Sequence, residues 1–278
     1  MRRRRCARFA RSAAVRAPFL TMSVFSVFAA ELAAAGGALA RRRFYSARYR
    51  VGKKENGETI TDADHEVEEL IASRVAEKYP EHGFLGEERG AVGDQERCWV
   101  VDPIDGTTNF VHRYESCAVA VAYCENGRAI AGAVHNIAAN ETFSAARGEG
   151  AFSDNRRLRG SAPSSFADSL FLAGGVLDDE MWEIIRNLSR RTAGMRRGGA
   201  TALDLALVAA GRADMLVCGP VRFWDVAAGA LLVREAGGLL ADAEDRTTFE
   251  FAAPTRRFVA GAAGVFAPYL AALKKGGE

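Results

Sequence analysis

Residues 99–110 read WVVDPIDGTTNF, and this stretch decides how the sequence is interpreted. An apolar run that ends in a carboxylate and a proline is typical of a buried strand that opens into a loop. Asp102 and Asp105 lie in a turn fixed by Pro103, so both carboxylates can point into one small volume. Two anions there repel each other unless a cation lies between them. The stretch therefore predicts a cation site at the end of a strand.

The residues around the two aspartates indicate which cation and which ligand to expect. Oxygen ligands suit Mg²⁺, and the carbonyl of Ile104 is available as one more. Gly106 lets the backbone approach an anion closely, and N–H groups at a helix start bind phosphate. Thr107 supplies a hydroxyl that can orient a water. A capped turn without chemistry is the alternative for the shorter D-P-x-D-G-T fragment.

Two more acidic elements can contribute to the same site. Gly86-Glu87-Glu88 would alone be a solvated acidic turn, but beside the aspartates Glu87 offers a carboxylate for metal binding or water activation. Asp225 ends the sequence Phe-Trp-Asp before a predicted helix. It is either the N-cap of that helix, which is the commoner role, or a metal ligand at the helix start.

The first half of the chain has a mixed pattern of helix and strand. Residues 62–79 show the apolar spacing of a helix, with Asp62 or Asp64 as its cap. Residues 117–124 and 129–135 are apolar runs joined by a short turn, which predicts a β-hairpin. We therefore expect an α+β arrangement in this half.

The second half alternates between helical and strand patterns, which predicts a layered α/β structure. Helices are expected at 201–211, 225–236 and 265–273, and strands at 214–218 and 258–262. The chain is thus divided into a basic leader (1–21), an α+β subdomain with the metal motif (22–158) and an α/β subdomain (159–278).

Charge is distributed unevenly along the chain. Residues 1–50 contain twelve Arg and one acidic residue, a net of +11, whereas residues 51–278 contain 25 basic and 34 acidic residues, a net of −9. The pI of about 8.3 therefore describes no single surface and does not predict nucleic-acid binding. One interpretation of residues 1–21 is that translation truly starts at Met22 and that these residues are not translated. The alternatives are an organelle-targeting leader and a nucleic-acid-binding arm.

The apolar segment near the N-terminus does not predict a membrane span. Residues 17–30 are fourteen largely apolar residues, fewer than the roughly 20 that a spanning helix needs. From Met22 onward the apolar spacing predicts an amphipathic helix instead. Five cysteines without a C-x-x-C pair favour a reducing compartment, so the cytoplasm is expected unless the leader directs the chain to an organelle.

Three motifs, GEE at 86–88, WVVDPIDGTTNF at 99–110 and WDVAAGALLVREAGG at 224–238, resemble the inositol monophosphatase family in type and order. The resemblance covers roughly residues 22–270. It implies the αβαβα sandwich of inositol monophosphatases and fructose-1,6-bisphosphatases, and hydrolysis of a small phosphorylated metabolite with two to three Mg²⁺ ions, sensitive to lithium. It also implies a homodimer, with no membrane or nucleic-acid partner.

The resemblance also assigns roles to individual residues. The metal ligands would be Glu87, Asp102, the Ile104 carbonyl, Asp105 and Asp225. Glu87 and Thr107 would help to deprotonate the attacking water, with Asp64 in a supporting role. Gly106, Thr107 and Asp225 would contact the phosphate or the substrate.

Two departures from the family pattern concern the substrate. Animal members carry a substrate-binding Glu at the position of Cys218, and a thiol cannot bind two hydroxyls as a carboxylate does. Ala200 stands where a hydroxyl residue is common, and the hydroxyl moves to Thr201. Myo-inositol monophosphate is the first expected substrate, with histidinol phosphate and 3′(2′),5′-bisphosphate nucleotides as alternatives. The alternative to an enzyme is a regulatory or RNA-associated binding protein, which would not need the carboxylates.

Overall fold

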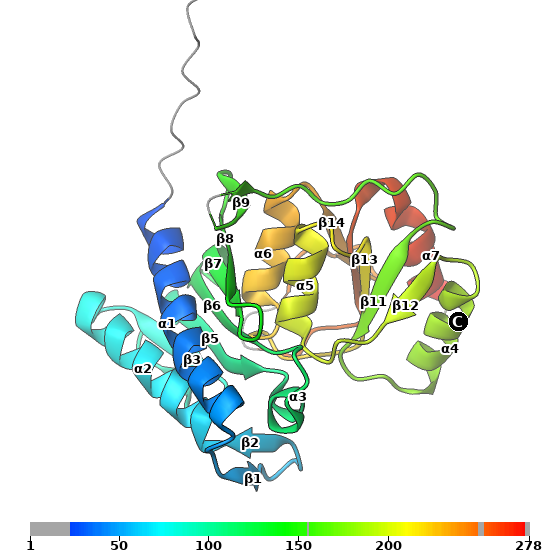
Figure 1. Ribbon diagram of the computed structural model, residues 1–278. Helices are drawn as coiled ribbons and strands as arrows, with labels where there is room; N and C mark the ends of the chain where they lie inside the picture. The colour runs from blue at the N-terminus through cyan, green and yellow to red at the C-terminus, as the bar shows by residue number, and fades with distance from the viewer. Residues whose placement is uncertain (1–22, 155, 250–252, 276–278) are drawn as a thin grey trace, which may run out of the picture.

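The structure is a computed structural model that describes residues 23–154, 156–249 and 253–275, so the predicted leader at 1–21 lies outside the described residues. The chain forms five layers in the order αβαβα, as the resemblance implied (Figure 1). Helices α1 and α2 cover one face of a large sheet, α5 and α6 lie between the two sheets, and α4 and α7 cover the far face of a smaller sheet. The helices are α1 (Val24–Ser46), α2 (Asp62–Lys78), α3 (Thr107–His112), α4 (Asp179–Ser189), α5 (Thr201–Ala209), α6 (Ala227–Glu235) and α7 (Phe266–Lys275).

The large sheet has eight strands in the order β10-β9-β8-β7-β6-β5-β3-β4. Only β3 and β5 run parallel to each other; the other neighbours are antiparallel. The predicted hairpin is confirmed, with Asn126 and Gly127 at its turn, both at positive φ as a tight hairpin turn requires. The strands are β3 (Gly83–Gly86), β4 (Gly90–Val92), β5 (Arg97–Asp105), β6 (Ala118–Glu125), β7 (Arg128–Asn136), β8 (Glu141–Ala146), β9 (Gly150–Ser153) and β10 (Arg156–Arg157).

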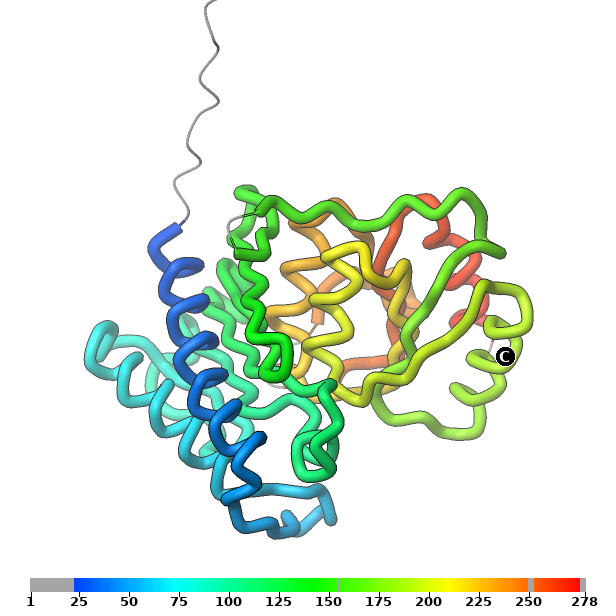
Figure 2. Tube along the Cα trace, viewed as in Figure 1, coloured from blue at the N-terminus to red at the C-terminus, as the bar shows by residue number. Residues whose placement is uncertain are grey.

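The smaller sheet has five strands in the order β12-β11-β13-β15-β14. The first three strands are parallel, and β15 is antiparallel to both of its neighbours, β13 and β14. The chain passes from the large sheet to this one through residues 158–169, seen as the long green segment in Figure 2. The strands are β11 (Leu170–Gly174), β12 (Gly194–Arg196), β13 (Met215–Cys218), β14 (Leu239–Asp242) and β15 (Phe258–Gly261); a separate hairpin is formed by β1 (Val51–Lys53) and β2 (Thr59–Thr61), and a 3-10 turn spans Ala263–Val265.

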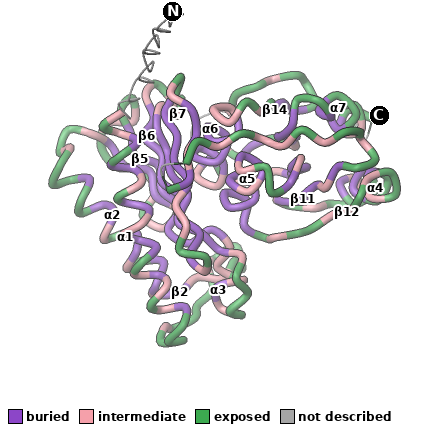
Figure 3. The backbone as a smooth tube through the Cα atoms, turned by 45° about the horizontal axis from the view of Figure 1, so that its top comes forward, coloured by how far each residue is buried: buried purple, intermediate pink, exposed green. Residues whose placement is uncertain are grey.

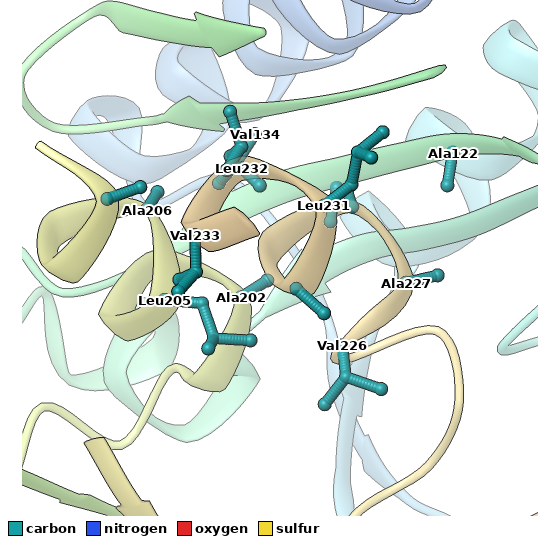
Figure 4. Close-up of a cluster of buried hydrophobic side chains, with 14 of the residues drawn as sticks. Ala122, Val134, Ala202, Leu205, Ala206, Val226, Ala227, Leu231, Leu232 and Val233 are labelled. Carbon is teal, nitrogen blue, oxygen red and sulfur yellow. The ribbon is translucent and has the colours of Figure 1, made fainter. Parts of the chain in front are cut away.

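The main core lies between the sheets, around α5 and α6. The central strands and both helices are almost entirely buried (Figure 3). Leu232 of α6 lies beside Val134 of β7, and Val233 lies beside Leu205 of α5 (Figure 4). Because α6 is enclosed on both sides, its first turn is held in a fixed position at the end of β5.

Helix α1 begins at Val24, where the Ser23 hydroxyl accepts a hydrogen bond from the Phe25 N–H. By length and composition α1 could cross a membrane, but much of its apolar surface is buried inside the protein. Phe28, Leu32 and Phe44 are buried in the core cluster shared with α2 and the large sheet. The helix therefore packs here as a core helix.

Helix α2 spans Asp62–Lys78, close to the predicted range, but its predicted cap was wrong. Thr61 is the N-cap, and its hydroxyl accepts a hydrogen bond from the Ala63 N–H. Asp64 lies at the third helical position, where its carboxylate reaches back to the Thr61 N–H at 2.8 Å. This capping box fixes Asp64 at the buried start of the helix.

Candidate active site

A cavity of about 530 Å³ opens where β5 ends and α3 and α6 begin. Nearly all residues predicted from the sequence line it, although they come from separate parts of the chain. They are Glu87, Asp102, Ile104, Asp105, Gly106, Thr107 and Asp225. Asp64 does not line the cavity and lies behind Thr107.

A β-bulge brings the two aspartates of the motif together. In a regular strand, residues three apart point to opposite faces of the sheet. The pairing of β5 with β6 shifts between Asp102 and Asp105, so one extra residue is inserted there. The Ile104 side chain consequently turns into the core on the α1 and α2 side, and Asp105 faces the cavity together with Asp102.

Main-chain donors hold two of the carboxylates. Asp105 Oδ2 accepts a hydrogen bond from the Leu203 N–H of α5 at 3.0 Å. Asp225 Oδ2 accepts one from the Arg222 N–H at 2.9 Å. The N-cap reading of Asp225 was therefore wrong: Val226 occupies the cap position without a side-chain bond, because Asp225 closes its own preceding turn.

Glu87 is held by a lysine from the β1–β2 hairpin. Lys54 Nζ lies 2.6 Å from Glu87 Oε1 and 2.7 Å from Glu88 Oε1. Burial lowers the pKa of Lys54, but the two carboxylates more than offset this and raise it above its ordinary value. Lys53 also lines the cavity, but its Nζ bonds to the Thr59 hydroxyl, so Lys54 is the lysine that contacts the two carboxylates.

Thr107 begins α3 and connects the cavity to α2. Its hydroxyl lies 3.2 Å from Asp64 Oδ1 and 3.0 Å from the Ile104 carbonyl oxygen, both acceptors. The hydroxyl proton is directed to those acceptors, so the oxygen lone pairs remain free to accept a hydrogen bond from a molecule in the cavity.

A second carboxylate of α2 supports the loop that carries Glu87, and no motif in the sequence indicated this role. Glu68 is 2% exposed. Its carboxylate accepts hydrogen bonds from the Glu88 N–H at 2.9 Å and the Arg89 N–H at 3.0 Å. Asp64 and Glu68 are four residues apart on one helix face, so α2 braces both α3 and the Glu87 loop.

The carboxylates that line the cavity raise one another's pKa. Burial, then the charges of Glu87, Asp105 and Asp225, raise the pKa of Asp102 well above its ordinary range. Burial above all raises the pKa of Asp105 to about 7 and that of Asp225 to about 8. Such a cluster is fully ionised only when positive charge is supplied.

The donor set fits a divalent cation. Every ligand candidate is an oxygen, and Asp102 Oδ1 is buried without a hydrogen-bond partner. Among the described residues, no three His, Cys, Asp or Glu side chains are already arranged to hold a metal ion. Lys54 and the main-chain N–H groups of Leu203 and Arg222 bond to oxygens of Glu87, Asp105 and Asp225.

The two departures from the family pattern lie outside the cavity wall. Cys218 is 0% exposed and Ala200 is 1% exposed, and neither lines the cavity. Thr201 lines it, so the displaced hydroxyl still faces the site. The wall also contains Arg197, Arg222 and Trp224, to which no role was assigned from the sequence.

Comparison with known proteins identifies a family for this chain. The sequence model of the inositol monophosphatase family matches residues 21–276. An inositol-1-monophosphatase of Mesorhizobium japonicum is 39% identical over 75% of this chain and 81% of its own length. A Nus factor SuhB of Pseudomonas aeruginosa is 40% identical over 69% of this chain and 75% of its own. The crystal structure of the extragenic suppressor protein suhB of Bartonella henselae superimposes with a TM-score of 0.85 at 34% identity, covering 91% of this chain and all of that one.

The fold and the family match thus place the chain in a class of phosphatases that is generally metal-dependent. The chain belongs to the inositol monophosphatase family.

Proposed function

We propose that this chain hydrolyses myo-inositol monophosphate to inositol and phosphate in the presence of Mg²⁺. The observation that carries the proposal is the convergence of Glu87, Asp102, Asp105 and Asp225 on one cavity beside the start of α3. A relative with the name inositol-1-monophosphatase supports the choice of substrate. We also propose the cytoplasm as its location.

The proposed metal ligands are Glu87, Asp102, the Ile104 carbonyl, Asp105 and Asp225, and two to three Mg²⁺ ions are proposed. Bound there, Mg²⁺ would neutralise the phosphate dianion and lower the pKa of water. Asp102 is the central member of the proposed ligand set, because the charges of the other three carboxylates, Glu87, Asp105 and Asp225, all raise its pKa.

The chain's own side chains would prepare the attacking water. Thr107 accepts a hydrogen bond from the water and so orients it, while Asp64 and the Ile104 carbonyl fix the direction of the Thr107 hydroxyl. Glu87 accepts the proton that the water loses. Asp64 thus acts as a positioning residue, since it touches Thr107 rather than the cavity.

The substrate would be held from two sides. The backbone at Gly106 and Thr107 offers N–H groups to the phosphate oxygens, and Gly106 permits this approach at φ 84°. A Cβ there would lie 2.9 Å from the Ser116 carbonyl oxygen, so a larger residue does not fit. Asp225, which lines the same cavity, would contact the substrate near the leaving oxygen.

The test is phosphate release from myo-inositol 1-phosphate, histidinol phosphate, 3′-phosphoadenosine 5′-phosphate and fructose 1,6-bisphosphate, with and without Mg²⁺ and with added Li⁺. We expect Mg²⁺-dependent, Li⁺-inhibited release, fastest from myo-inositol 1-phosphate. Faster release from another of the four would replace the substrate while keeping the phosphatase. No release from any would overturn the proposal.

The second candidate is a regulatory or RNA-associated binding role. It is favoured by the relatives that carry the name Nus factor SuhB. Such a role would not require the carboxylates of the cavity. A variant without turnover, such as Asp102→Asn, that still performs the cellular task of the protein would favour binding over hydrolysis.

A further inference from the structure

A second cavity shares the turn at residues 222–225 with the candidate active site. It has a volume of about 280 Å³ and lies between α6, the β6–β7 turn and residues 248–249. Phe223 lines this cavity, whereas Arg222, Trp224 and Asp225 line the first. No lining residue belongs to both cavities, so the second is a separate site.

The floor of this second cavity is apolar. Ala227, Ala230 and Leu231 present one face of α6 to it, and Ala227 and Leu231 lie on the same side of the helix in Figure 4. Phe223 is 4% exposed, and Phe249 is held against Phe258 with ring centroids 4.9 Å apart. A floor of small and aromatic side chains suits a compact apolar body such as a single ring.

The rim is positively charged and not neutralised. Arg128, Arg147 and Arg234 line the cavity, and in the described part of the chain none of their guanidinium groups has a hydrogen-bond or ion-pair partner. Glu235 also lines the cavity, but it is not paired with these arginines. Its two carboxylate oxygens accept hydrogen bonds from the Gly148 and Gly150 N–H groups, each at 2.9 Å.

Two of these arginines also repel each other. Burial lowers the pKa of the half-buried Arg234, and the charge of Arg147 lowers it further. Like charges brought together beside an apolar floor cost stability unless an anion joins them. Guanidinium groups bind carboxylate and phosphate oxygens through paired hydrogen bonds, so such an anion would relieve the repulsion directly.

We propose that this cavity binds a small organic anion, with a ring or short apolar body on the α6 floor and a carboxylate, phosphate or phosphonate group between Arg147 and Arg234. A ligand against Phe223 also touches the turn that carries Asp225, because the Val226 and Ala227 N–H groups bond to the Phe223 carbonyl at 3.2 and 3.0 Å. Binding is therefore expected to change the rate of hydrolysis; this second step rests on the proposed function.

The experiment is calorimetric titration of the full chain, with Mg²⁺, against three probes. Benzylphosphonate carries both the ring and the anion, acetate carries only an anion, and benzyl alcohol carries only the ring. The variant Arg147→Gln/Arg234→Gln removes the proposed anion contacts, and Arg190→Gln, at the C-cap of α4 and away from this cavity, is the matched control. Because Arg147 and Arg234 have no partners to lose, we expect the double variant to fold with an unchanged or higher melting temperature.

Benzylphosphonate is expected to bind more tightly than acetate or benzyl alcohol, and the double variant is expected to weaken it by about tenfold or more. Arg190→Gln should bind normally. The variant Asp102→Asn should retain binding, which separates this site from the active site. Absence of binding, or equal binding by the double variant, would overturn the site, as would loss of binding in Asp102→Asn alone. If benzylphosphonate binds but alters hydrolysis equally in wild type and double variant, the link to Asp225 is wrong while the site stands.

Discussion

The Asp64 carboxylate and the Thr107 hydroxyl lie 3.2 Å apart, which ties the first turn of α2 to the first turn of α3. The same Asp64 closes the capping box with Thr61, so one side chain both starts a helix and orients a candidate active-site hydroxyl. Glu68, one turn later on α2, holds the backbone beside Glu87. Helix α2 therefore positions two parts of the site without lining the cavity.

Replacing Thr107 by valine removes the hydroxyl while keeping the size of the side chain. We expect kcat for the best substrate to fall by about 100-fold with KM little changed, because water orientation is lost while the main-chain phosphate contacts remain. Thr107→Ser keeps the hydroxyl and should recover most of the rate. Steady-state kinetics of the two variants, with normal far-UV circular dichroism, provide the measurement. Equal losses in both would show that the methyl group matters and the hydroxyl does not.

Replacing Asp102 by asparagine removes the central carboxylate and keeps its shape. Turnover is expected to fall by at least about 1,000-fold, since no other side chain can take its place among the ligands. The melting temperature of the metal-free protein should stay the same or rise, because a buried carboxyl group whose ionised form is disfavoured by burial and by its neighbours is gone. Retained Mg²⁺-dependent turnover would contradict the proposed ligand set.

The pH dependence of metal-free stability follows from the raised pKa values of Asp105 and Asp225, about 7 and about 8. In the unfolded chain these groups titrate near about pH 4. Between about pH 4 and pH 8 the folded state binds more protons than the unfolded state, so its stability falls as pH rises.

Mg²⁺ should reverse this loss of stability by supplying positive charge. We expect the Mg²⁺-induced rise in melting temperature to be larger at pH 8 than at pH 5. Thermal unfolding with EDTA and with Mg²⁺ at both values measures it, and Asp225→Asn serves as the control with a shallower pH dependence. An equal or smaller rise at pH 8 would show that no cation joins these carboxylates.

Gly37 permits α1 to approach the large sheet. A Cβ added at Gly37 would lie 2.0 Å from His135 Cδ2, and the imidazole is buried. Gly37→Ala is expected to destabilise the protein by about 1–3 kcal/mol, because the ring has no room to move. His135→Ala in the same chain should recover part of the loss, which chemical denaturation of the single and double variants measures. A Gly37→Ala variant as stable as wild type would show that α1 can shift away from β7.

The helices and strands that were predicted from the sequence have local signals. The apolar spacing of residues 62–79, the turn at Asn126-Gly127 and the alternation after residue 200 each determine a helix or strand within a few residues. The helix caps were predicted less well. Thr61 rather than an aspartate is the N-cap of α2, and the sequence did not distinguish them because both residue types are common at that position.

The residue types of the site could be identified from the sequence, because Asp102, Asp105 and Asp225 fall in motifs whose spacing is chemically informative. Pro103 predicted that Asp102 and Asp105 would approach each other in a loop after the strand. The pairing of β5 with β6 instead brings them together at a bulge within the strand, which depends on contacts between two segments. The choice of Lys54 over Lys53, the support from Glu68 and the burial of Cys218 likewise depend on contacts between distant segments. Packing of remote elements sets these contacts, and no local pattern encodes them.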